Sequence, residues 1–118
     1  MQHATVTDIH RTILFQGGIT YRPDVVAPTT GYMVSLAGSE RMMHVDRFSV
    51  AAYEQYLTDY RIRVRSTNAL FYGAWVDGGY VYLDLSINVQ SLEEAKGLGH
   101  MESQLAIFDV ANETVISL

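Results

Sequence analysis

The chain has 118 residues, 48% of them hydrophobic, and a net charge of −5. That length suits one domain, and that hydrophobic content supports a folded core, which excludes general disorder. Cysteine is absent, so disulfides, thiolate metal sites and a cysteine nucleophile are excluded. The negative charge argues against nucleic acid as a partner, because binding to phosphates needs a cationic surface.

Signals for targeting or membrane insertion are not found in the sequence. The first eight residues have neither the basic region nor the apolar region of a secretory signal. No apolar run approaches the ~20 residues that a membrane-spanning helix needs. We therefore expect a cytoplasmic protein with no membrane partner.

The first part of the chain is predicted to form three strands. Residues 4–15 are rich in β-branched side chains and partly alternate, which is typical of a strand. Two prolines make residues 19–30 an extended loop, with at most a short strand at residues 19–21. Residues 31–36 and 41–45 then predict the second and third strands of a meander.

A helix is predicted to follow Ser49, a favourable N-cap, and to end near residue 60 or 61. Its apolar side chains recur at helical spacing and include Tyr53, Tyr56 and Tyr60. This tyrosine stripe is typical of a core face, and tyrosines beside arginines also suit an interface between two copies. Because symmetric dimers are common among small apolar chains, we expect a homodimer.

Three arginines, Arg61, Arg63 and Arg65, lie at or beyond the predicted end of this helix. In an extended segment all three would lie on one face, where guanidinium groups could bind a phosphate through paired hydrogen bonds. The alternative is a solvated helix end whose cations complement the helix dipole. The sequence therefore makes these arginines candidate anion-binding residues.

The clearest local pattern is a β-hairpin formed by residues 70–76 and 81–89 around Asp77-Gly78-Gly79-Tyr80. Alternation places the aliphatic side chains of both strands on one face and aromatic side chains on the other. If the aromatic face is open, its tyrosine and tryptophan side chains can anchor a partner. The alternative is that a helix covers this face, or that aromatic pairs only stabilise the sheet. The candidate partner-binding residues are Phe71, Trp75, Tyr80, Tyr82 and Asp84.

A second helix is predicted to begin after Ser91, within a capping-box pattern, and to run to about residue 103. Gly97 and Gly99 weaken it by about 1 kcal/mol each relative to alanine. Strands over residues 105–110 and 114–118 complete the order β-β-β-α-β-β-α-β-β. This order predicts an α+β fold, one domain over the whole chain, with a largely antiparallel sheet and two helices.

No catalytic constellation is evident in the sequence. No serine lies in a Gly-x-Ser-x-Gly elbow, and neither a P-loop nor a dinucleotide fingerprint is present. The pairs Asp8–His10 and His44–Asp46 would each share a strand face and could hold a metal with a third ligand, but spacing by two residues is a weak signal. We therefore expect no metal site, no cofactor and no enzyme, the alternative being an active site assembled across a dimer.

Three segments of the second half carry a family resemblance. They are residues 73–79 (GAWVDGG), 81–86 (VYLDLS) and 104–110 (QLAIFDV), within a similarity that spans roughly residues 31–118. The pattern resembles a family of small uncharacterised proteins of actinobacteria and their phages. The resemblance implies a cytoplasmic phage or prophage accessory factor and supplies no catalytic residue, since that family has no established function.

These observations predict a small non-enzymatic binding protein that contacts a host protein through its aromatic face. The alternative is a protein that binds or sequesters a small phosphate-containing ligand, held by the three arginines while an aromatic ring stacks on it.

Overall fold

A seven-stranded antiparallel sheet forms the centre of the computed structural model, which describes residues 5–23 and 25–118. The strands lie in the order β1-β4-β5-β2-β6-β7, and β3 pairs with β5 beside β2. The helices are α1 (Val6–Gln16), α2 (Val50–Arg65) and α3 (Leu92–Met101), with a 3₁₀ turn at Val45–Arg47. The strands are β1 (Gly18–Tyr21), β2 (Tyr32–Ser35), β3 (Arg41–His44), β4 (Leu70–Asp77), β5 (Tyr80–Val89), β6 (Ala106–Asp109) and β7 (Thr114–Ser117). The predicted α+β class and antiparallel sheet are confirmed.

The β4–β5 hairpin is the longest pairing in the sheet, and its prediction is confirmed. Asp77 pairs with Tyr80, which leaves Gly78 and Gly79 as a two-residue turn. Both glycines have positive φ angles, 57° and 83°, as a type I′ turn requires. This turn sets the register that separates the aliphatic face from the aromatic face.

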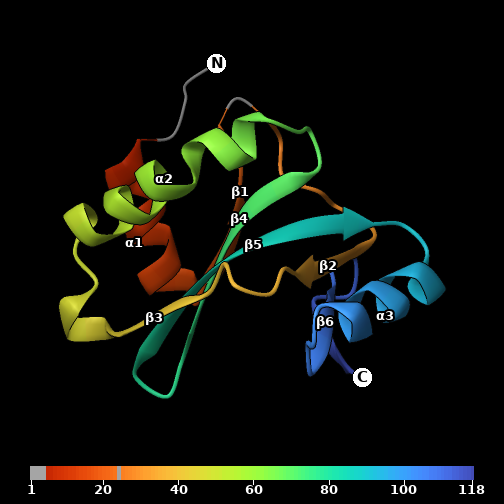
Figure 1. Cartoon of the computed structure of the whole chain (residues 1–118). Helices are drawn as coiled ribbons and strands as arrows, with labels where there is room; N and C mark the ends of the chain where they lie inside the picture. The colour runs from red at the N-terminus through yellow and green to blue at the C-terminus, as the bar shows by residue number, and fades with distance from the viewer. Residues whose placement is uncertain (1–4, 24) are drawn as a thin grey trace.

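All three helices pack on the aliphatic face of the sheet. α1 and α2 cover β4 and β5, and α3 covers β2 and β6, so that Figure 1 shows the two groups of helices at opposite ends of the sheet. The first core cluster includes Ile9, Ile13, Tyr53, Tyr56 and Leu57 from the helices. Tyr53 and Tyr56 of the tyrosine stripe are therefore core, and Tyr60 is partly buried against them. The homodimer itself stays a prediction.

The strand predicted for residues 4–15 is wrong, since the described part of this segment is helix α1. Thr5 and Asp8 form a reciprocal capping box at its start, and Gly17 ends it in the left-handed conformation with φ 86°. Ile9 and Ile13, one helical turn apart, are buried. The packing of these two side chains in the core outweighs the β propensity of the segment. The described chain therefore has three helices instead of the predicted two. The short strand expected near residues 19–21 is present as β1.

The edge of β5 that does not pair with β4 is shared by two strands, β3 and β2, with a loop between them. β3 pairs with residues 80–83 and β2 with residues 86–89 of β5. Between them, the buried Ser39 hydroxyl accepts a hydrogen bond from the Leu85 amide (3.0 Å) and donates one to the Leu36 carbonyl (2.7 Å). Ser39 thus satisfies the Leu85 amide, which a continuous strand would have bonded to a backbone carbonyl.

Candidate binding surface

The sheet face opposite the helices carries three of the predicted aromatic residues, Trp75, Tyr80 and Tyr82, at its β3 end. Trp75 and Tyr82 lie directly opposite each other, and their rings stack with centroids 4.3 Å apart and planes 14° apart. Trp75 remains 44% exposed and Tyr80 40% exposed. No helix of the described chain covers these side chains, because all three lie on the other face.

Strand β3 extends this surface with two residues that the sequence did not single out. Met42, 57% exposed, pairs with Tyr82, and His44 pairs with Tyr80 and makes an edge contact with its ring. The alternation of residues 41–45 was a possible signal, but the sequence did not show that β3 would pair with β5. We call the five side chains of Trp75, Tyr80, Tyr82, Met42 and His44 the aromatic platform.

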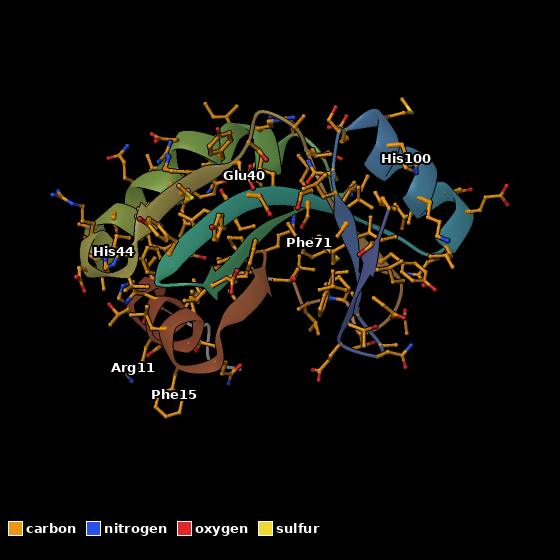
Figure 2. The ribbon with its side chains drawn as sticks, turned by 90° about the horizontal axis from the view of Figure 1, so that it is seen from below. Arg11, Phe15, Glu40, His44, Phe71 and His100 are labelled. Atoms are coloured by element: carbon orange, nitrogen blue, oxygen red, sulfur yellow. The ribbon has the colours of Figure 1, made fainter. Side chains whose placement is uncertain are left out.

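Phe71 and Asp84 do not belong to the exposed part of this face. They are only 8% and 7% exposed, although they have the same strand parity as Trp75. Figure 2 shows Phe71 near the middle of the molecule, whereas His44 lies toward its β3 end. The prediction that Phe71 and Asp84 form part of the exposed surface is therefore wrong, because strand parity determines which face a side chain points to and not whether that face is covered.

Asp84 is a buried carboxyl group that borders the aromatic platform. Its Oδ2 accepts a hydrogen bond from the Ser35 hydroxyl at 2.8 Å. The carboxyl group lies over Gly73, where any Cβ atom would collide with it. Burial raises the pKa of Asp84, the Ser35 hydrogen bond opposes this shift, and the negative charge of Glu40 adds to it. A raised carboxyl pKa is a feature of some catalytic sites, but among the described residues only Ser35 hydrogen-bonds to this side chain.

The arginine cluster is arranged differently from the prediction. α2 continues to Arg65, so Arg61, Arg63 and Arg65 are helical and do not share one face. Arg61 and Arg65, four residues apart, line a hollow together with Arg22, whereas Arg63 is not part of its lining. Arg22 could not be found from the sequence, since it lies in an irregular segment with no motif of its own.

The histidine–aspartate pairs considered as metal ligands have structural roles. Asp8 caps α1, and His10 donates a hydrogen bond from Nε2 to the Phe48 carbonyl (2.6 Å). His44 Nδ1 accepts a hydrogen bond from the Asp46 amide at the start of the 3₁₀ turn. Within residues 5–23 and 25–118, no three metal-ligating side chains of the His, Cys, Asp and Glu types lie close enough together to hold an ion.

No protein-family model, curated protein or solved structure matches this chain. The resemblance to proteins of actinobacteria and their phages stays a prediction. In the described part of the chain no helix has the length and apolar character to cross a bilayer. The functional argument therefore depends on the geometry of the chain's own residues.

Proposed function

We propose that this protein is a small binding domain that contacts another protein through the aromatic platform. The observation that carries the proposal is the Trp75–Tyr82 stack, in which Trp75 stays 44% exposed on a sheet face that no helix of the described chain covers. Large aromatic side chains bury much area at a low entropic cost and dominate the energetics of many interfaces. A stacked pair is also held in place before binding, so little rotamer freedom is lost.

The charges around the platform favour a partner with basic groups. Asp77 at the turn, Glu40 before β3 and Asp46 after β3 are exposed carboxylates at the border of the platform. The faces of tryptophan and tyrosine rings also attract cations. We therefore propose a partner surface with an apolar centre and arginine or lysine side chains at its rim.

Binding is proposed in preference to catalysis because the buried carboxyl group near the platform, that of Asp84, has no acid–base partner among the described residues. Asp84 hydrogen-bonds to Ser35, and no histidine or lysine of the described chain makes a hydrogen bond to it. The resemblance of residues 31–118 supports a host protein of an actinobacterium as the partner, with this chain as a cytoplasmic phage or prophage accessory factor.

The experiment is a quantitative pull-down from actinobacterial lysate with the wild type, Trp75→Ala and Ile62→Ala. Ile62 is a matched control, since it is an exposed apolar side chain on α2, on the other side of the sheet. We expect one protein to be enriched by the wild type and by Ile62→Ala, and the Trp75→Ala variant to lose about 2 kcal/mol of binding free energy. Equal capture by a folded Trp75→Ala variant, or no enriched protein, would contradict the proposal.

A further inference from the structure

A hollow of about 390 Å³ lies between α1, α2 and the segment after β1, on the face of the sheet opposite the aromatic platform. This volume is within the range of small-molecule sites. Its lining combines three arginines with apolar and aromatic side chains: Arg22, Arg61, Arg65, Tyr21, Tyr72, Val6, Pro23, Leu57 and Val64.

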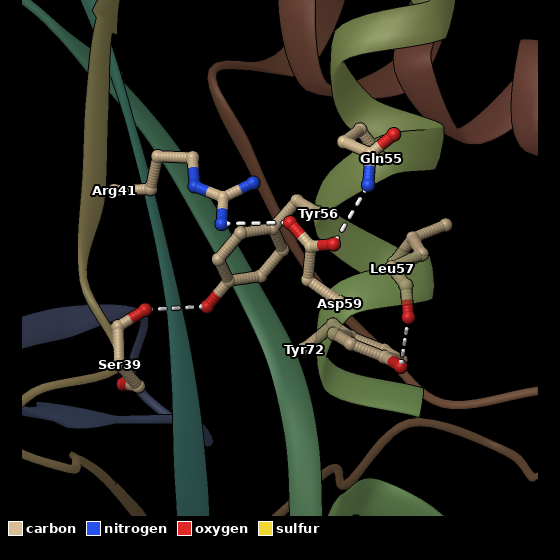
Figure 3. Close-up of polar contacts among 7 residues, drawn as sticks. All are labelled: Ser39, Arg41, Gln55, Tyr56, Leu57, Asp59 and Tyr72. Carbon is tan, nitrogen blue, oxygen red and sulfur yellow. Dashed lines mark hydrogen bonds and ion pairs between the residues drawn. The ribbon is translucent and has the colours of Figure 1, made fainter. Parts of the chain in front are cut away.

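The three arginines of the hollow have no carboxylate within ion-pair distance among the described residues. Arg41 shows the contrast, since its guanidinium group pairs with Asp59 at 2.9 Å (Figure 3). Arg22 donates one hydrogen bond to the Leu70 carbonyl at 2.8 Å, which orients its guanidinium group. A guanidinium group has five N–H donors, so most of those on Arg22 remain available to a ligand.

The three arginines and Tyr72 line the same hollow. Burial raises the pKa of the Tyr72 hydroxyl, and the positive charges of Arg61, Arg65 and Arg22 all oppose that shift. The positive charges that line the hollow therefore favour an anion within it. That hydroxyl donates to the Leu57 carbonyl at 2.9 Å, so it is already satisfied within the protein (Figure 3).

The lining also indicates what kind of anion fits. Guanidinium groups match the geometry of phosphate oxygens and bind them through paired hydrogen bonds. Inorganic phosphate alone would leave the apolar walls, including Leu57 and Val64, without contact. The stacked rings of Tyr21 and Tyr72, with centroids 6.3 Å apart, form an aromatic wall for a flat organic group.

We propose that this hollow binds a small phosphate monoester with a ring-shaped organic group, its phosphate held by Arg61, Arg65 and Arg22 and its ring packed against Tyr21, Leu57 and Val64. A long nucleic acid does not fit this proposal, because the chain carries a net charge of −5 and one hollow contacts one phosphate group. The site is separate from the aromatic platform and does not depend on the proposed function.

The test is a titration with phenyl phosphate, followed by isothermal calorimetry and by NMR shifts of the α2 amides. The variants are Arg61→Gln, Arg65→Gln and the control Arg63→Gln, which makes the same charge change on the same helix outside the hollow. We expect Arg61→Gln and Arg65→Gln to weaken binding at least tenfold and Arg63→Gln to weaken it less than twofold. Inorganic phosphate and phenol should each bind more weakly than phenyl phosphate.

Three results would overturn the proposal. They are no saturable binding of phenyl phosphate, equal weakening by all three variants, and equal binding of inorganic phosphate and phenyl phosphate. Equal weakening would indicate a nonspecific effect of net charge, which raised salt would remove in every variant alike. Thermal melting of each variant checks that the fold is intact. A Trp75→Ala variant should bind phenyl phosphate like the wild type, which separates this outcome from that of the proposed function.

Discussion

Three buried tyrosines allow a direct test of the hydrogen-bond pattern in the core. The Tyr56 hydroxyl donates to the Ser39 carbonyl at 2.8 Å, and the Tyr72 hydroxyl donates to the Leu57 carbonyl at 2.9 Å (Figure 3). The hydroxyl of Tyr53 is buried as well but has no hydrogen-bond partner in the described structure. Burial raises the pKa of all three tyrosines, so each hydroxyl keeps its proton at neutral pH.

Replacement by phenylalanine removes only the hydroxyl oxygen, and the expected effect on stability differs between the tyrosines with a hydrogen-bond partner and the one without. A buried hydrogen bond contributes about 0.5–1.5 kcal/mol, and an unsatisfied buried partner costs about 1–3 kcal/mol. Tyr56→Phe and Tyr72→Phe should therefore lower the free energy of unfolding by about 1–2 kcal/mol each. Tyr53→Phe should leave it unchanged or raise it by up to about 1 kcal/mol, because the lost hydroxyl is desolvated without a partner.

Urea unfolding measures these differences. The wild type and the three variants should share one m value, so that the shift in midpoint reports stability alone. A Tyr53→Phe variant destabilised as much as Tyr56→Phe would refute the reasoning, since it would mean that the Tyr53 hydroxyl makes a stabilising hydrogen bond. Equal stability of all four proteins would refute it as well.

Two further predictions concern a carboxyl group and a pair of glycines. Because burial raises the pKa of Asp84, the folded state binds its proton more tightly than the unfolded chain does, and ionisation of Asp84 at neutral pH lowers stability. As the pH falls from 7 toward 4, the stability of the wild type should therefore rise relative to Asp84→Asn in urea unfolding, and parallel pH curves would contradict this. In α3, Gly97→Ala should raise the melting temperature, with a gain of up to about 1 kcal/mol, because nothing lies within 4 Å of the added methyl group. Gly99→Ala should lower it, because the added Cβ would lie 2.5 Å from Leu118 Cδ1 and 3.2 Å from Cγ2 of the buried Ile107, and a gain in stability would show that both side chains move aside without cost.

The elements that could be predicted from the sequence are those fixed by local chemistry. The two glycines after Asp77 determine the hairpin turn, and Ser49 begins α2 by accepting a hydrogen bond from the Ala52 amide. These signals lie within a few residues of the structure they determine. The division of the hairpin into an aliphatic and an aromatic face follows from the same local register.

The elements that could not be predicted depend on contacts between distant segments. Helix α1 is rich in β-branched residues, and the packing of Ile9 and Ile13 against α2 and the sheet adds to the local signals of its Thr5–Asp8 capping box and Gly17. Burial of Phe71 and Asp84 could not be predicted from strand parity, which gives the face of a side chain but not what covers it. Arg22 reaches the α2 arginines only because β1 pairs with β4, which no local pattern indicates. Long-range pairing therefore determines both candidate sites.

The central claim is that the aromatic platform is a partner-binding surface, and Trp75 can report on it directly. It is the only tryptophan of the chain, so the intrinsic tryptophan fluorescence comes from the platform alone. The measurement is acrylamide quenching of this fluorescence with and without a saturating amount of the captured partner, whose own tryptophans are replaced by phenylalanine. The account predicts a blue-shifted emission and strong protection from acrylamide in the complex, because Trp75 becomes buried. Unchanged emission and unchanged quenching in the saturated complex would contradict it, since the partner would then bind elsewhere.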